Sequence, residues 1–103
     1  MEGHPLISPE VLARYAADAA RDVSGVSGLG ESGLHRGRGA TVHEADGVFS
    51  VEMQLELEWG RSAADVGPAV QASVSDYLER MAARVPASVD VVVVGVGPPP
   101  ATK

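Results

Sequence analysis

The stretch at residues 48–60, VFSVEMQLELEWG, places the strongest constraint on how this chain folds. Apolar and polar side chains alternate along it with a period of two, and the apolar positions are Val51, Met53, Leu55, Leu57 and Trp59. This period gives each set its own face of a β-strand, whereas a helix would scatter both sets around its circumference. One face must be buried and the other solvated, as in an antiparallel sheet covered on one side only. We therefore expect the rest of the chain to supply the cover, with Trp59 in the core.

A hairpin precedes this strand. Residues 40–45 have the composition of a short strand, and Asp46-Gly47 separates them from the long one. An Asp-Gly pair between two strand-like segments is a strong signal for a two-residue hairpin turn, because both positions favour positive φ. Gly60 and Arg61 then end the long strand.

The first helix is predicted to begin at Ser8-Pro9-Glu10. Ser8 can cap free backbone amides, Pro9 suits the first helical position, and Glu10 suits the positive end of the helix dipole. The helix should run to about Val23. Its apolar stripe comprises Val11, Leu12, Tyr15, Ala16, Ala19, Ala20 and Val23.

A second amphipathic helix follows the long strand. Ser62 and Asp65 resemble a capping box in which Asp replaces the usual Glu or Gln. Gly67-Pro68 conflicts with a helix already under way, so we expect a short first turn and then a regular helix from about Pro68 to Pro86. Its apolar stripe comprises Val66, Val70, Val74, Tyr77, Leu78, Met81 and Val85.

Glycine-rich sequence fills the interval between the first helix and the hairpin. Residues 23–29, VSGVSGL, are expected to end the helix and turn the chain. Residues 30–39 read as a surface loop carrying His35, Arg36 and Arg38, and the two arginines could alternatively bind an anion. The loop lacks a GK[ST] sequence and the spacing of GxGxxG, so it matches no phosphate-binding pattern.

The last predicted strand covers residues 89–96, VDVVVVGV, which are apolar on both faces and suit a central strand. Residues 97–103 read as a disordered Pro-rich tail, and residues 5–7 could form a short edge strand. The predicted order is (β)αββαβ in an α+β two-layer sandwich. Two helices would pack on one face of a small, mostly antiparallel sheet, in a single domain over residues 1–103 with its core at 6–96.

Composition excludes several classes of function. Cysteine is absent, so the chain has no disulfide framework and no thiolate site. A net charge of −6 argues against general binding to nucleic acid, which requires a basic patch. The first 30 residues contain no signal-peptide pattern, and no apolar run approaches the roughly 20 residues that span a bilayer. We therefore expect a cytoplasmic protein without a membrane span.

The sequence offers no catalytic or metal-binding motif. His4, His35 and His43 are scattered, with no spacing typical of metal ligands. No serine lies in a nucleophile elbow. Three carboxylates, Glu52, Glu56 and Glu58, share one face of the long strand, but acid–base catalysis would require a cleft that separates their pKa values. We predict a protein without catalytic, cofactor or metal sites.

The open face of the sheet is the more informative surface. In the last strand Asp90, Val92, Val94 and Val96 share one face, and helices on one side of the sheet would leave several of these valines exposed. Exposed apolar patches often mark association surfaces. We therefore predict an interaction surface for a protein partner or a second copy, formed by Val92, Val94, Glu52, Glu56 and Glu58.

Several segments together resemble the alkaline-shock, or Gls-type, envelope stress response proteins of bacteria. ISPEVLARYAADAARDVSGVSGL is similar to that family's opening helix and glycine turn, and VEMQLELEWG to its alternating strand. The similarity reaches Val70-Gln71 in the second helix and Gly95-Val96 at the end of the last strand. It covers about residues 6–96. It implies a non-enzymatic cytoplasmic protein of cell-envelope homeostasis, which self-associates or is held at the membrane by a membrane-anchored partner.

Two other readings remain open from the residues. A small nucleic-acid-binding module could use Arg36 and Arg38, although the acidic strand argues against it. A small-molecule carrier or enzyme would require a deep pocket with convergent polar groups.

Overall fold

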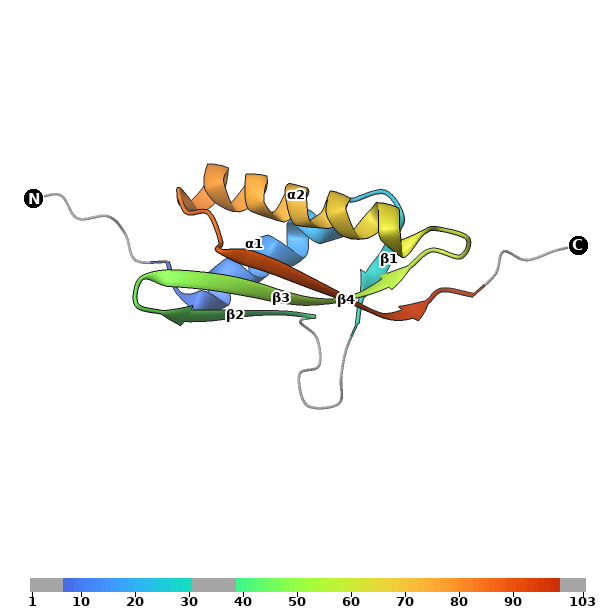
Figure 1. Ribbon diagram of the computed structural model, residues 1–103, viewed down its shortest axis with the longest axis horizontal. Helices are drawn as coiled ribbons and strands as arrows, with labels where there is room; N and C mark the ends of the chain where they lie inside the picture. Colours follow the sequence, from blue (N-terminus) through green and yellow to red (C-terminus); the bar gives the residue numbers. More distant parts are fainter. Residues whose placement is uncertain (1–6, 31–38, 99–103) are drawn as a thin grey trace, which may run out of the picture.

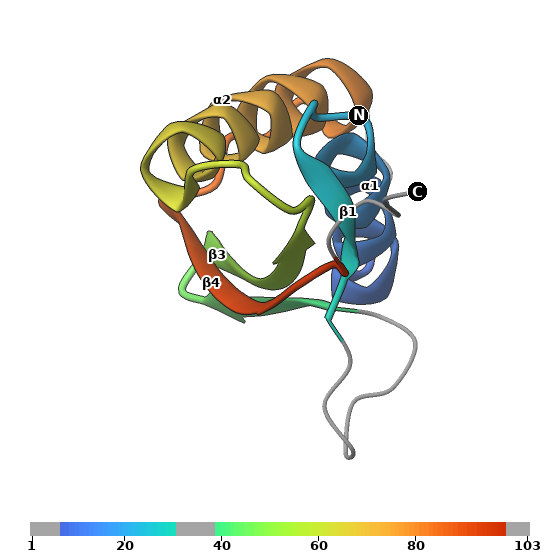
Figure 2. The ribbon, with the colours of Figure 1, turned by 90° about the vertical axis from the view of Figure 1, so that its right-hand side faces the viewer.

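The computed structural model describes residues 7–30 and 39–98. In these residues two helices and four strands follow one another as α1 (Pro9–Arg21), β1 (Val26–Leu29), β2 (Ala40–Ala45), β3 (Val48–Leu57), α2 (Ala63–Ala82) and β4 (Ser88–Val96). Figure 1 shows α2 above the strands and α1 crossing behind β2 and β3. The end-on view in Figure 2 shows α1 and α2 side by side over the same face of the sheet. This is the predicted α+β two-layer sandwich.

β3 is the central strand of the sheet. β1 and β2 lie end to end along one edge of it, both antiparallel, with β1 beside its C-terminal half and β2 beside its N-terminal half. β4 runs along the other edge and is parallel to β3. The interpretation of residues 89–96 as a central strand was therefore wrong, and the longest pairing in the sheet is parallel. The reason is that α2 carries the chain back across the sheet, and such a crossover connection joins parallel strands.

The hairpin between β2 and β3 is confirmed. Asp46 has φ 55° and Gly47 has φ 77°, so both turn residues adopt the left-handed conformation. This is the backbone of a type I′ turn, whose twist matches that of the flanking strands. The turn pairs Ala45 with Val48 and thereby sets the register of the whole hairpin.

α1 begins as predicted. The Ser8 hydroxyl accepts a hydrogen bond from the Val11 amide at 3.2 Å, and Pro9 occupies the first helical turn. The helix ends at Arg21. Its buried face consists of Leu12, Ala13, Ala16, Ala17, Ala19 and Ala20. The alanines among them have small side chains, which let the helix approach the sheet and α2 closely.

The segment predicted as a turn at residues 23–29 contains a strand. The chain turns at Gly25, which has φ 100°, and then forms β1, which pairs with Leu55, Glu56 and Leu57. β1 is only four residues long and contains Gly28, so its own sequence lacks the usual features of a strand. It is a strand because the C-terminal half of β3 offers it an unpaired edge.

α2 is continuous, contrary to the expected break at Gly67-Pro68. It begins at Ala63 and contains Pro68, while Ser62 makes no side-chain capping bond. Pro68 has no N–H and therefore removes one intrahelical hydrogen bond from this part of the helix. Val66 and Val70 are buried on either side of it and hold this turn of the helix against the core.

The core lies between the helices and the inner face of β3. Val51, Met53, Leu55 and Leu57 are buried there, as predicted. Trp59 is not part of the core, because 57% of it is exposed. β3 ends at Leu57, and the chain turns at Gly60. The alternation of the strand therefore no longer determines which way the Trp59 side chain points. The apolar stripe predicted for the second helix also extends beyond the residues that are buried.

The exposed end of that stripe comprises Met81 and Val85. Other predictions concern residues that lie outside the described ranges. They are the first two residues of the edge strand expected at residues 5–7, the residues His4, His35, Arg36 and Arg38, and the chain end beyond Pro98. Ile7, the third residue of that range, lies in no strand.

Candidate interaction surface

The face of the sheet opposite the helices is the candidate site. We call it the outer face and define it by Thr41 and His43 of β2, Glu52, Gln54 and Glu56 of β3, and Asp90, Val92 and Val94 of β4. The pairing of the strands arranges these side chains in rows across the sheet. Thr41, Glu52 and Asp90 form one row, and Gln54 and Val92 form the next.

Two valines supply the apolar part of the outer face. Val92 is 46% exposed and Val94 is 50% exposed. The ladder shifts register between Leu55 and Glu56, where Val94 is the extra residue of β4. A Cβ atom added at Gly30 would overlap the Cγ2 atom of Val94, so this valine lies over β3 against the glycine. The bulge thus directs an apolar side chain across the sheet.

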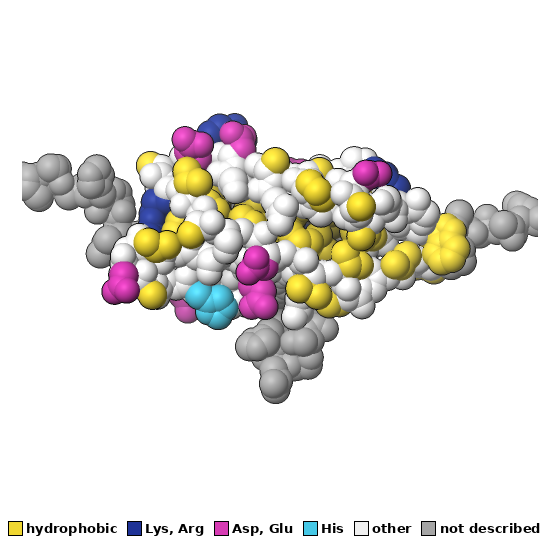
Figure 3. All heavy atoms as spheres, in the orientation of Figure 1, with side chains coloured by type: hydrophobic (Ala, Val, Ile, Leu, Met, Phe, Trp, Pro, Cys, Tyr) yellow, Lys and Arg dark blue, Asp and Glu magenta, His cyan; other side chains and the backbone are white. Residues whose placement is uncertain are grey.

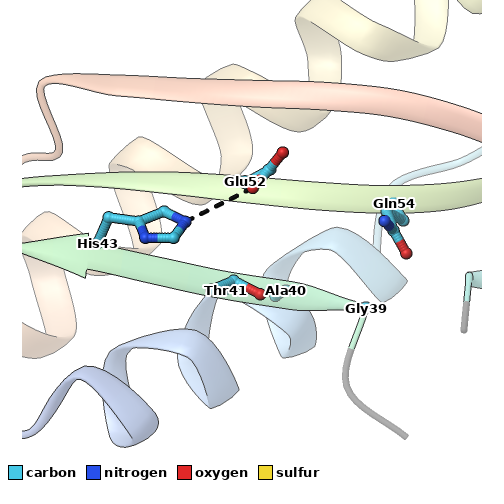
Figure 4. A pocket seen from close by; sticks show the side chains of 6 residues that line it. All are labelled: Gly39, Ala40, Thr41, His43, Glu52 and Gln54. Carbon is cyan, nitrogen blue, oxygen red and sulfur yellow. Dashed lines mark ion pairs between the residues drawn. The ribbon is translucent and has the colours of Figure 1, made fainter. Parts of the chain in front are cut away.

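Carboxylates surround the valines. Glu52 lies in register with Asp90 on the neighbouring strand, and its carboxylate is 3.5 Å from the imidazole of His43 (Figure 4). All these side chains are exposed. The neighbouring carboxylates of Glu52 and Asp90 repel each other, so this part of the sheet stays solvated. It presents a negative electrostatic field to any partner. Glu56 adds another carboxylate further along β3, at the position in register with Gly95 of β4.

Glu58 stands apart from the other predicted residues. It lies beyond the end of β3, and its carboxylate is 3.4 Å from the guanidinium of Arg61. Arg61 also donates to the hydroxyl of Ser24 at 3.3 Å. Four of the five predicted surface residues therefore lie together on the outer face, and Glu58 belongs to an ion pair at the end of the sheet.

Sequence reasoning left Thr41, His43, Gln54 and Asp90 out of the surface. The first two could have been found, because the Asp46-Gly47 turn sets the register of β2 against β3. The place of Asp90 beside Glu52 depends on the parallel register of β4, which no local signal indicates.

A hollow of about 290 Å³ opens on the outer face. Its lining consists of Gly39, Ala40, Thr41, His43, Glu52 and Gln54 (Figure 4). The hollow is bounded by two strands and is open to solvent, so it does not enclose a ligand as a deep pocket would. Within residues 7–30 and 39–98 no three His, Cys, Asp or Glu side chains are grouped so as to hold a metal ion.

Neither helix of the described chain combines the length and the apolar character that a membrane crossing requires.

The described part of the chain defines a small α+β fold, in which two helices lie behind a sheet and the other face of the sheet is acidic, partly apolar and uncovered. A family model matches residues 1–98, which is nearly the whole chain. It describes the alkaline-shock protein 23 family, with a cell envelope-related function. The chain belongs to this family, as the resemblance predicted. No curated protein matches the chain.

Solved structures with a similar fold carry the name MamM. A histidine-to-alanine variant of MamM-CTD has a TM-score of 0.65 at 20% identity, covering 85% of this chain and 98% of that one. A valine-to-arginine variant of MamM has a TM-score of 0.66 at 20% identity, with 91% of each chain covered. The nickel form of an aspartate-to-asparagine variant of MamM CTD reaches 0.64 at 19% identity over 84% and 96%. At these identities the likeness concerns the fold alone.

Proposed function

We propose that this protein is a non-enzymatic interaction or scaffold protein of the cell envelope stress response. It acts in the cytoplasm, where it associates with further copies of itself or with a membrane-anchored protein that holds it at the membrane. The outer face is its contact surface. Membership in a family with a cell envelope-related function supports the biological setting.

The observation that carries the proposal is the exposure of two valines among carboxylates on a face that no other described element covers. Val92 and Val94 are about half exposed, Val92 in the regular part of the sheet and Val94 at the bulge of β4. An apolar centre with a charged rim is the usual composition of a protein contact surface. A catalytic role has less support, because the hollow beside these residues is open.

The test is to place charge at the apolar centre. The double variant Val92→Glu with Val94→Glu should reduce self-association, measured by light scattering coupled to size-exclusion chromatography over a range of concentrations. It should also reduce binding to membrane vesicles that contain the envelope proteins. Burial of an unpaired carboxylate in a contact costs several kcal/mol, so the loss of binding should be large.

The matched control places the same two charges on the helix side. Ala69→Glu with Ala72→Glu alters exposed positions of α2 and should leave association unchanged. Circular dichroism must show that both double variants are folded. If the Val92 and Val94 variant associates with itself and binds the vesicles as the wild type does, the outer face is not the contact surface.

A further inference from the structure

The free edge of β4 is a separate feature from the outer face. β3 directs its backbone groups alternately to its two neighbours. Gln54 accepts from Gly30 at 2.7 Å and donates to Gly39 at 2.8 Å, so the even-numbered residues bond on the β1 and β2 side. The carbonyls of Phe49 and Leu57 accept from the residues that flank β4, so the odd-numbered residues bond on the β4 side.

This alternation determines which groups of β4 remain unpaired. Val51 lies in register with Val89, and in a parallel ladder a residue bonds to the two neighbours of its partner. Val89, Val91 and Val93 therefore point their own N–H and C=O groups away from β3. The side-chain amide of Gln71 in α2 reaches over this edge and donates to the Val89 carbonyl at 2.8 Å. In the described chain Val91 and Val93 have no such cover.

The exposed edge lacks the features that usually prevent strands from pairing. Edge strands are commonly protected by lysine, by proline or by an inward-pointing charge. β4 contains neither lysine nor proline, and its one charged residue is Asp90. The bulge at Val94 comes only after the unprotected stretch. Hydrophobic side chains gather in the band between α2 and β4 in Figure 3, beside this edge.

We propose that β4 pairs with β4 of a second copy of this chain, antiparallel, with Val92 opposite its own counterpart. This inference rests on the proposed interaction role and assigns it to the strand edge. Each Val91 then lies opposite Val93 of the second copy. The N–H and C=O groups of Val91 and Val93, which are unpaired in one copy, then bond to the same four groups of the other copy. Two sheets thereby join into one, and both outer faces form a single surface.

Charge favours this register. The chain has a net charge of −6, so any contact between copies must keep acidic groups apart. With Val92 at the two-fold axis, Asp90 of each copy lies opposite Val94 of the other, and the two aspartates are separated along the strands. Self-pairing should strengthen as salt is raised, because screening weakens the overall repulsion. A basic partner peptide on the acidic face would instead bind less tightly in salt.

The first experiment uses single cysteines, since the chain has none of its own. Opposed residues of a non-hydrogen-bonded antiparallel pair have Cα atoms about 4.5 Å apart, within the range of a disulfide. Val92→Cys should therefore form a disulfide-linked dimer under mild oxidation. Gln54→Cys is the matched control in the same row, and its copies would lie about 14 Å apart across three strand spacings, too far to link.

The second experiment blocks the edge without breaking the ladder. The Val93 N–H points to solvent in one copy, so Val93→Pro preserves the bonds between β3 and β4 but cannot pair with a second copy. This variant should be monomeric at concentrations where the wild type is dimeric. Val93→Thr keeps the N–H and the branched side chain and should still dimerise. Hydrogen exchange tests the wild type without any substitution. The amides of Val91 and Val93 should be protected only at high protein concentration.

The outcomes separate this inference from the proposed function. Disulfide formation at Val92 but not at Gln54, with a monomeric Val93→Pro variant, supports edge pairing. Equal linking at both positions would mean that outer faces stack on each other, which overturns edge pairing but keeps the outer face as the contact. A monomeric wild type with unprotected Val91 and Val93 amides overturns edge pairing too. The outer face would then be tested by vesicle binding alone.

Discussion

At the scale of single residues, Arg84 connects the segment after α2 to the hairpin between β2 and β3. It follows Ala83, whose φ of 58° turns the chain out of α2. Its guanidinium is 3.0 Å from the Glu44 carboxylate and donates to the Gly47 carbonyl at 3.3 Å. It also lies 4.7 Å from the centroid of the Phe49 ring. One partly buried side chain thus fixes the hairpin turn against the segment between α2 and β4.

Removal of this side chain should weaken the protein measurably. Arg84→Ala is expected to lower the free energy of unfolding by about 1 to 2 kcal/mol, since it removes an ion pair, a backbone hydrogen bond and a cation–π contact together. Urea denaturation followed by circular dichroism measures the change. Arg21→Ala is the control, because its pair with Asp18 is half exposed and should contribute less than about 0.5 kcal/mol. Equal effects would mean that Arg84 acts only as a surface charge.

At the scale of elements, the contact between β4 and the end of β1 crosses the central strand. Gly30 follows β1, and its amide bonds to the Gln54 carbonyl at 2.7 Å. The Val94 side chain fills the space where a Cβ of residue 30 would lie. A side chain at residue 30 would force this neighbour from the other edge of the sheet to shift. Gly28, within β1, has open space around it.

The two glycines should therefore respond differently to alanine. Gly30→Ala is expected to destabilise the fold by about 1 to 3 kcal/mol, as overpacking in a tight contact usually does. Gly28→Ala should be neutral or stabilising by up to about 1 kcal/mol, because alanine loses less backbone entropy.

Adding Val94→Ala to Gly30→Ala should recover most of the loss, and a double-mutant cycle from urea melts measures the coupling. Independent effects of the two substitutions would show that the contact does not limit residue 30.

At the scale of the whole molecule, one core joins both helices to the sheet. Leu12 of α1, Leu55 of β3 and Leu78 of α2 are all fully buried in it. Tyr15 of α1 and Tyr77 of α2 make an edge-to-face contact between the two helices, with 6.0 Å between their ring centroids. Because the layers share this core, we expect them to unfold together.

Leu12→Ala tests this cooperativity. The cavity it leaves should reduce the free energy of unfolding by about 2 to 5 kcal/mol. The urea transition should remain single, with an unchanged slope, by circular dichroism and by tryptophan fluorescence. Arg14→Ala, on the exposed side of the same helix, should have little effect. Separate transitions for helix and sheet signals would contradict a shared core.

Local chemistry made part of this structure predictable. The Asp46-Gly47 turn, the Ser8 cap and the alternation of β3 each depend on residues close in sequence, and the structure has all three. The outer face of β3 followed from the alternation, so Glu52 and Glu56 could be placed on it from the sequence.

Other features depend on contacts between distant segments. β1 is a strand because β3 pairs with it, and Pro68 is helical because its neighbours pack into the core.

By itself, then, the sequence determined the two layers and which face of the central strand is apolar. Periodicity and turn preferences depend on interactions between residues that are close in sequence. Only the tertiary structure decided that β4 runs parallel to β3 at an edge and that Trp59 points to solvent. The physical reason is that an apolar strand can lie at the centre or the edge of a sheet. Its place is set by the path of the preceding helix, and the free edge this leaves on β4 is where we expect a second copy to bind.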